Sequence, residues 1–249
     1  MNRRWATWGL RATMAALLLA GTGCALLPQE EVPEKGFWLR YEKPAATDEA
    51  HARFLKNWQL AEFTLADLNA YVDLPHLVTV LAKSCHGEGT GYDPDTRTIA
   101  ICYDDLAEPR ELLGDEDLSD VVRVTLYHEA GHALIDALDL PDEGPRAEAD
   151  AADRFAQVAL LRGHPEDEET LLTAARLFDR AIAADPGAAG TTDEHAPDAA
   201  RAESHRCAVR GKAPGRHKDL ASPSRTDCAA IWTRTRDTWI RDLAPLLRP

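Results

Sequence analysis

The pentapeptide HEAGH at residues 128–132 constrains the fold of this chain more than any other feature, because it lies within an apolar pattern with helical spacing. Residues i and i+4 share one face of a helix, so the imidazoles of His128 and His132 can approach one metal ion from the same side. Asp117 or Ser119 can cap such a helix. We therefore predict a helix that carries two metal ligands on one face and ends near residue 138.

Glu129 directly follows the first of these histidines and is rotated from it by about 100° around the helix. It can therefore reach a water bound to the ion without being a ligand itself. Zinc lowers the pKa of such a water toward about 7, and the carboxylate can accept its proton as a general base. This chemistry predicts hydrolysis of amide bonds, with Zn²⁺ as cofactor and a peptide or protein as substrate. A buried helix with two hydrogen-bonded histidines is the structural alternative.

The third metal ligand is expected on the next predicted helix. A metzincin would carry Gly and His where this chain has Ile135 and Leu138, so that class is excluded. The next helix begins with three acidic residues, of which Glu148 has the longest reach and is the expected ligand, with Asp150 as the alternative. Asp153 can hydrogen-bond a ligand imidazole from behind. The alternative for all three is an acidic first turn that complements the helix dipole.

The remaining pattern predicts a mostly helical α+β fold with a small antiparallel β element. Residues 76–85 and 98–103 are rich in β-forming residues, and turn residues at 92–96 lie between them, which indicates a hairpin. The second of these strands can offer its edge to an extended peptide. Helical spacing predicts further helices at 48–69, 147–161 and 170–184, around Cys207, and from Cys228 to about 244.

The N-terminus is typical of an exported lipoprotein. Residues 1–11 are basic and 12–20 are apolar, a run too short to cross a membrane. Small residues then precede Cys24, as in a bacterial lipobox, which predicts removal of residues 1–23 and a lipid on Cys24. Residues 24–48 are expected to be a flexible tether, and 49–249 the folded domain. A plain signal peptide with an unrelated cysteine is the alternative.

The other four cysteines form two pairs that are local in sequence. In an exported chain they predict two disulfides, Cys85–Cys102 and Cys207–Cys228, although spacing alone allows three connectivities. A four-cysteine zinc site is disfavoured because no C-x2-C pair is present. The formal net charge of −14 would repel phosphates, which excludes nucleic acid as a partner.

The chain resembles a bacterial family classed as HExxH zinc metallopeptidases, whose substrates are unknown and many of whose members are exported. The resemblance covers most of residues 67–245 and rests on the motif helix and these segments: Leu68-Asn69, Leu74-Pro75, Tyr92-Asp93-Pro94, Ile101-Cys102-Tyr103, Leu140-Pro141, Asp150-Ala151-Ala152-Asp153, Asp193-Glu194-His195, Arg201 and Cys207. It implies a gluzincin-like, zincin-type domain with the β element packed beside the motif helix. The family carries a Glu at the position of Ala149, whereas this chain has its Glu at 148.

This departure favours a second hypothesis, in which the chain is a non-catalytic envelope lipoprotein that keeps the scaffold or a structural zinc. A chelator should inhibit a peptidase site without unfolding it, whereas removing a structural ion should unfold the domain.

His195 is the expected second catalytic residue. It lies in a glycine-containing loop, from which its ring could move in to donate a hydrogen bond to a tetrahedral oxyanion. Arg201 is a weaker candidate for the same task. A solvated loop histidine and a surface ion pair are the respective alternatives.

Overall fold

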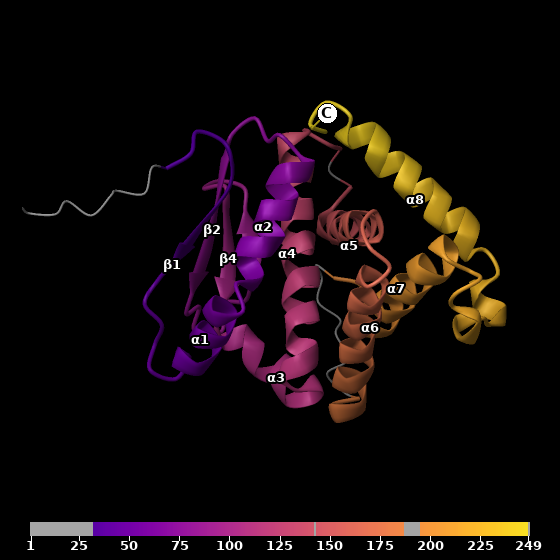
Figure 1. The fold of residues 1–249 in the computed structure, drawn as a ribbon, viewed down its shortest axis with the longest axis horizontal. Coiled ribbons are helices and arrows are strands. Elements are labelled where there is room, and N and C mark those ends of the chain that lie inside the picture. Colours follow the sequence, from indigo (N-terminus) through magenta and orange to yellow (C-terminus); the bar gives the residue numbers. More distant parts are fainter. Residues whose placement is uncertain (1–31, 142, 187–194, 249) are drawn as a thin grey trace, which may run out of the picture. The chain divides into compact units, whose positions relative to one another are not determined.

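Four strands form one mixed sheet in the order β1-β2-β4-β3 (Figure 1). The computed structural model describes residues 32–141, 143–186 and 195–248, so the signal segment, Cys24 and the first part of the tether lie outside the described residues. The strands are β1 (Gly36–Tyr41), β2 (Leu77–Lys83), β3 (Gly91–Asp93) and β4 (Thr98–Cys102). The expected mostly helical α+β class is confirmed.

The predicted hairpin between residues 76–85 and 98–103 is wrong. β2 and β4 are parallel neighbours, with Val80 opposite Ile99, and the antiparallel pair is β3 with β4. Alternating buried side chains along β2 suit either strand direction, and the connection to β4 is long enough to hold β3. As a result β4 is an internal strand, and β3 takes the edge position at which a peptide could add.

The predicted tether also ends earlier than expected, because Gly36–Tyr41 pairs with β2 as a parallel strand. Asn69 helps to hold this strand through its side chain: the Asn69 Oδ1 atom accepts from the Phe37 backbone N–H at 2.8 Å, and Nδ2 donates to the Phe37 carbonyl at 2.9 Å. A polar composition thus did not prevent this segment from joining the sheet, where Phe37 is buried.

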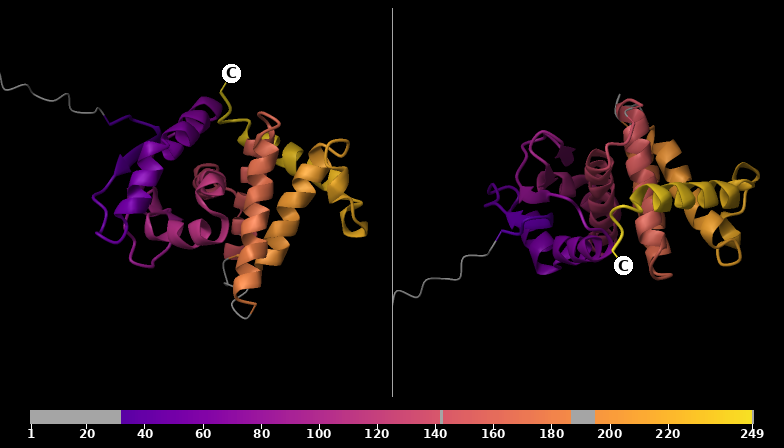
Figure 2. Two further views of the ribbon diagram at one scale, coloured as in Figure 1. Left: turned by 60° about the horizontal axis from the view of Figure 1, so that its bottom comes forward. Right: turned by 90° about the horizontal axis from the view of Figure 1, so that it is seen from above.

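Helices cover the sheet and account for most of the fold (Figures 1 and 2). Their bounds are α1 (Glu49–Asn57), α2 (Leu60–Tyr71), α3 (Ala107–Leu113), α4 (Asp115–Ala137), α5 (Pro145–Leu161), α6 (Asp167–Ala184), α7 (Asp198–Lys212) and α8 (Cys228–Leu243), with short 3-10 turns at Asp104–Leu106, Lys218–Leu220 and Pro223–Arg225. The helix expected at 48–69 is two helices, because Gln59 adopts a left-handed conformation with φ 51° between α1 and α2. No helix among the described residues is long and apolar enough to cross a membrane.

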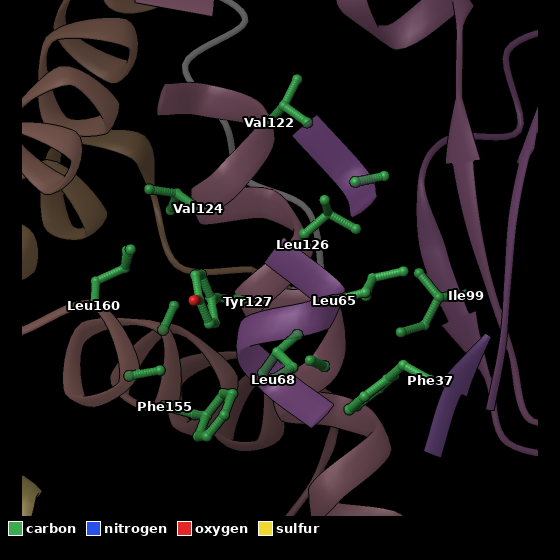
Figure 3. Packing of buried hydrophobic residues seen from close by; sticks show 14 of the residues in the cluster. Phe37, Leu65, Leu68, Ile99, Val122, Val124, Leu126, Tyr127, Phe155 and Leu160 are labelled. Atoms are coloured by element: carbon green, nitrogen blue, oxygen red, sulfur yellow. The ribbon is translucent and has the colours of Figure 1, made fainter. Parts of the chain in front are cut away.

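The helix that carries the histidine motif, α4, lies in the middle of the core. Every residue from Leu126 to Leu134 is buried, because α2 and the sheet contact α4 on one side and α5 and α6 contact it on the other. Figure 3 shows Tyr127 between these layers, with Leu68 and Phe37 on one side and Leu160 on the other. The apolar pattern around the motif therefore reflects burial on all faces.

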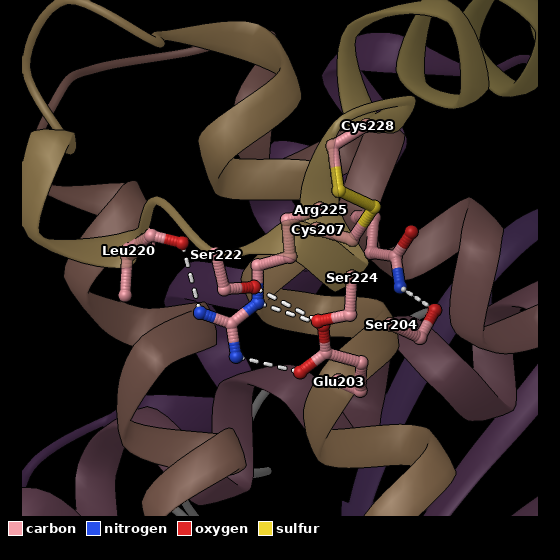
Figure 4. The surroundings of a disulfide bond; sticks show 9 residues. Glu203, Ser204, Cys207, Leu220, Ser222, Ser224, Arg225 and Cys228 are labelled. Atoms are coloured by element: carbon pink, nitrogen blue, oxygen red, sulfur yellow. Dashed lines mark hydrogen bonds and ion pairs between the residues drawn. A yellow bond between two sulfur atoms is a disulfide. The ribbon is translucent and has the colours of Figure 1, made fainter.

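Both predicted disulfides are present. Cys85–Cys102 joins the carboxyl ends of β2 and β4, which lie side by side because the two strands are parallel. Cys207–Cys228 joins α7 to the first turn of α8, beside the Arg225–Glu203 ion pair (Figure 4).

Candidate metal centre

The site is built where α4 and α5 approach each other closely at Gly131. A Cβ atom on Gly131 would lie 2.8 Å from the Cα atom of Ala152, closer than real side chains come. A glycine within a helix costs stability, and this close approach is the physical reason for it. The short distance between the helices brings the carboxylates of α5 to the imidazoles of α4.

Each motif histidine is held by a carboxylate at its Nδ1 atom. The Asp153 Oδ1 atom lies 2.7 Å from Nδ1 of His128, and the Glu148 Oε1 atom lies 2.6 Å from Nδ1 of His132. His128, Glu129 and His132 are 4%, 6% and 9% exposed. A carboxylate accepts a hydrogen bond, so Nδ1 is the donor in each ring and Nε2 is the nitrogen that faces away from the carboxylate.

Arg201, from α7, fixes the carboxylate behind His128. Its Nε and Nη2 atoms donate to the two oxygens of Asp153 at 2.9 and 2.8 Å, which is a bidentate ion pair. Burial by itself raises the pKa of Asp153, but the hydrogen bonds from His128 and Arg201 outweigh burial and hold that pKa well below its ordinary value. Asp153 is therefore a carboxylate at any physiological pH. Because Arg201 is occupied in this way, its structural position does not match the oxyanion role considered from sequence.

The Nε2 atom of His128 lies close to the Nε2 atoms of two other histidines. Nε2 of His128 lies 3.2 Å from Nε2 of His132 and 3.3 Å from Nε2 of His195, and the rings of His128 and His195 are stacked. The structure thus places His195, which is 67 residues beyond His128 in sequence, beside the first motif histidine. Asp193 and Glu194, which accompany it in the sequence motif, lie outside the described residues.

This donor set fits a divalent cation such as zinc. Nδ1 of His128 and of His132 faces a carboxylate, so Nε2 is the nitrogen of each ring that can bind a cation, and Nε2 of His195 lies beside Nε2 of His128. Two ligands of a tetrahedral zinc with bonds of about 2.0–2.1 Å lie about 3.3 Å apart, close to both separations seen here. Among the described residues, however, no group of three or more His, Cys, Asp or Glu side chains is already arranged as a complete metal site.

A cleft of about 700 Å³ opens beside these histidines, and Glu129, His132 and His195 line it. Residues of β3 form part of its wall, and α8 contributes Thr238 and Asp242. The hydroxyl of Tyr92 on β3 donates to Asp136 on α4 at 2.8 Å, which ties the edge strand to the motif helix. A substrate that lies along β3 would therefore pass close to Glu129.

The structure brings most of the sequence-predicted site residues together, but Glu148 and Asp150 do not make the metal contacts that were expected of them. Glu148, the expected third ligand, faces Nδ1 of His132 and not the side on which the Nε2 atoms meet. Asp150, its alternative, lines a separate cavity of about 150 Å³ with Asp153 and Arg201. Thr238 and Asp242 were not predicted to take part, because no local motif marks residues that only the packing of α8 brings to the cleft.

A helix that carries two histidines on one face and a neighbouring glutamate beside a cleft, with carboxylates at the Nδ1 atoms of both rings, is the arrangement of an HExxH metal enzyme. The comparison with protein families agrees with this class. Residues 41–243 match the family described as Putative metallopeptidase (DUF4344), and the chain belongs to that family. Comparison with curated proteins and with solved structures finds no match.

Proposed function

We propose that this protein is a zinc-dependent peptidase in which His128, His132 and His195 hold the ion and Glu129 is the general base. The observation that supports this proposal is the approach of the Nε2 atoms of His132 and His195 to Nε2 of His128, at 3.2 and 3.3 Å, while carboxylates hold Nδ1 of both motif histidines. Buried carboxylates behind ligand imidazoles orient the rings and raise their basicity, as in many zinc sites.

When bound, zinc supplies Lewis-acid polarisation of a carbonyl and a lowered pKa for water. The chain's own contribution is proton transfer and positioning. Glu129 lies on the cleft side of α4, one residue after the first ligand, where it can take the proton of the attacking water and deliver it to the leaving amine. Asp153 and Glu148 stay behind the rings and keep both imidazoles in the tautomer that a metal requires.

The substrate peptide is proposed to bind as an added strand along β3. This strand is the edge of the sheet, and residues Thr90 to Tyr92 line the cleft. Main-chain hydrogen bonds to an edge strand hold an extended peptide whatever its side chains are. The strand expected for this role from sequence, at residues 98–103, is covered by β3 and cannot pair with a peptide on that side.

Zinc content and turnover of matched variants test the function. Wild-type protein should bind one zinc and cleave members of a broad peptide panel. Glu129→Gln should keep the zinc and lose turnover by at least about 100-fold, because general-base catalysis contributes about 10²–10⁴-fold. Equal turnover of Glu129→Gln and wild type on every cleaved peptide would contradict the proposed role of Glu129.

The third ligand is tested by comparing His195→Ala with Glu148→Gln. If His195 binds zinc directly, His195→Ala should weaken zinc affinity more than Glu148→Gln does, since loss of a carboxylate that only orients a ligand costs about 10–100-fold. Competition with a chelating dye measures both affinities. The reverse order would make Glu148 the ligand, as first expected from the sequence.

Chelation separates the peptidase from a non-catalytic scaffold with a structural ion. The buried hydrophobic core extends from Phe37 in β1 to Leu243 in α8, far beyond the histidine cluster. We therefore expect a chelator to abolish activity while the far-UV circular dichroism spectrum stays unchanged. Unfolding on metal removal would instead support the structural ion.

The proposed location follows from the N-terminal sequence and the disulfides. We propose an exported protein, anchored to a bacterial membrane by a lipid on Cys24, with residues 49–249 and the strand at Gly36–Tyr41 outside the cytoplasm. Two disulfides are consistent with an oxidising compartment. Mass spectrometry of the mature protein, purified from the membranes of the bacterium that expresses it, should show an acylated N-terminal Cys24. A Cys24→Ser variant should be released in soluble form.

A further inference from the structure

The cleft beside the proposed metal centre carries acidic side chains on several of its walls. Asp136 comes from α4, Asp139 and Glu143 from the α4–α5 connection, and Asp242 from α8. None of the described residues that line the cleft is Lys or Arg. The lining therefore presents one sign of charge to whatever enters it.

Neighbouring cations neutralise only part of this charge. Asp242 is paired with Arg241, whose Nε atom lies 3.0 Å from it. Asp136 accepts its hydrogen bond from the Tyr92 hydroxyl, and burial together with Asp136 raises the pKa of Tyr92, so this partner stays neutral. Asp139 and Glu143 are exposed and form no ion pair within the described part of the chain.

Basic residues next to the cleft, such as Arg146 between the lining residues Pro145 and Ala147, do not contribute to its lining. Arg97 is close enough to act electrostatically on Tyr92 and His76, but neither Arg97 nor His76 contributes to the lining. The net charge of the whole chain, −14, adds to the negative potential. Concave surfaces with charge of one sign concentrate the field and enrich ligands of the opposite sign.

We propose that this cleft selects peptide segments that carry Lys or Arg close to the bond to be cleaved. This inference rests on the proposed function, since it treats the cleft as the peptide-binding site. Asp139 and Glu143 are the specificity-determining residues, because they are exposed, unpaired in the described structure and placed between the motif helix and the start of α5. An extended cationic peptide along β3 would bring its basic side chains to these carboxylates.

Peptide binding to the Glu129→Gln protein loaded with zinc tests the inference without turnover. Two fluorescent peptides should be compared by anisotropy, identical except that two Lys residues in one are Glu in the other. We expect the Lys peptide to bind at least about tenfold more tightly in 50 mM NaCl, and this ratio to shrink in 500 mM NaCl because salt screens exposed charges. Equal affinities at low salt, or a preference for the Glu peptide, would overturn the inference.

A matched pair of double variants separates the cleft from the overall charge. Asp139→Asn with Glu143→Gln should reduce the Lys-to-Glu affinity ratio by about two- to tenfold, since each exposed ion pair contributes up to about fivefold. The control, Glu108→Gln with Glu111→Gln on the exposed side of α3, removes the same number of charges away from the cleft and should leave the ratio unchanged. Equal effects of the two double variants would contradict a role for Asp139 and Glu143.

The two proposals fail in distinguishable ways. If wild-type protein cleaves no peptide but the Glu129→Gln protein binds Lys peptides selectively, the charge selection stands and the peptidase function fails. If wild-type protein cleaves Lys and Glu peptides with equal kcat/KM, the function stands and the charge selection fails.

Discussion

Arg201 acts on the candidate site through another residue, since its guanidinium binds both oxygens of Asp153 and Asp153 in turn holds Nδ1 of His128. Its side chain also stacks over Phe178, with the guanidinium carbon 4.7 Å from the ring centre. Arg201 is thus a positioning residue whose planar, two-pronged geometry matters as much as its charge.

The first prediction at this scale concerns Arg201→Lys. A lysine keeps the charge but can donate to only one carboxylate oxygen at a time, so Asp153 and His128 should be held less firmly. We expect zinc affinity to fall by about tenfold, measured by chelator competition, with the folded state retained. The matched control is Arg206→Lys on the same helix, where the arginine pairs with Asp179 away from the site. Equal effects of the two substitutions would contradict the positioning role.

His205 gives a prediction about pH. Its ring is fully buried, its Nε2 atom has no hydrogen-bond partner among the described residues, and burial lowers its pKa from 6.5 to about 4. The unfolded chain therefore binds a proton between pH 6.5 and pH 4 that the folded chain does not bind. Stability contributed by neutral His205 is fully present above pH 6.5 and decreases as the pH falls toward 4.

We expect this residue to lower the free energy of unfolding by about 2 kcal/mol between pH 6.5 and pH 5. Urea titrations at both pH values measure the difference. His205→Phe keeps an aromatic ring against Phe178 and removes the titrating group, so its stability should depend less on pH by this amount. An unchanged pH dependence in His205→Phe would show that other groups cause it.

At the level of elements, the contact between α4 and α5 determines the geometry of the site, and Gly131 allows that contact. A methyl group there would meet the backbone of Ala152, which cannot move away as a flexible side chain could. The two helices would have to separate, which would withdraw Glu148 and Asp153 from the imidazoles.

Gly131→Ala should therefore destabilise the protein, even though alanine favours helix formation. Overpacking costs about 1–3 kcal/mol and helix propensity returns about 1 kcal/mol, so we expect a net loss of up to about 2 kcal/mol in urea unfolding, together with weaker zinc binding. Gly215→Ala is the control, because a Cβ there meets nothing within 4 Å. Gly131→Ala with unchanged stability and zinc affinity would contradict the close-contact explanation.

At the scale of the whole molecule, the disulfides add to the stability that the hydrophobic core provides. Cys207–Cys228 joins residues 21 positions apart and ties α8, which forms part of the cleft, to α7. In the chain-entropy account, closing a loop of this length stabilises the folded state by about 3 kcal/mol. A Cys207→Ala, Cys228→Ala double variant should lose about 2–4 kcal/mol in urea unfolding. In a reducing buffer, where the wild-type bridge is also open, the variant and the wild type should have the same free energy of unfolding. Equal free energies of unfolding in an oxidising buffer would show that the bridge does not stabilise the protein.

Local sequence was sufficient for the features that depend on residues close in the chain. His128 and His132 share a face because i and i+4 always do so in a helix, and the apolar residues around them predict the burial of α4. Most helices were likewise predictable from spacing, whereas spacing indicated the two local disulfide pairs but left three connectivities open. The directions of β2 and β4 were not, because the alternation of side chains along a strand is the same in parallel and antiparallel pairs.

The sequence by itself therefore determined the motif helix, the pair of histidines with Glu129 and the mostly helical class, and it indicated the two disulfides without fixing their connectivity. Only the tertiary structure decided that His195 approaches His128, that Glu148 and Asp153 bind ring nitrogens from behind, and that β3 is the edge strand. The physical reason is the separation along the sequence of the residues that make contact. Helical periodicity relates residues a few positions apart, whereas these contacts join segments 16 to 67 residues apart, and only the packing of α5, α7 and the sheet against α4 brings them together.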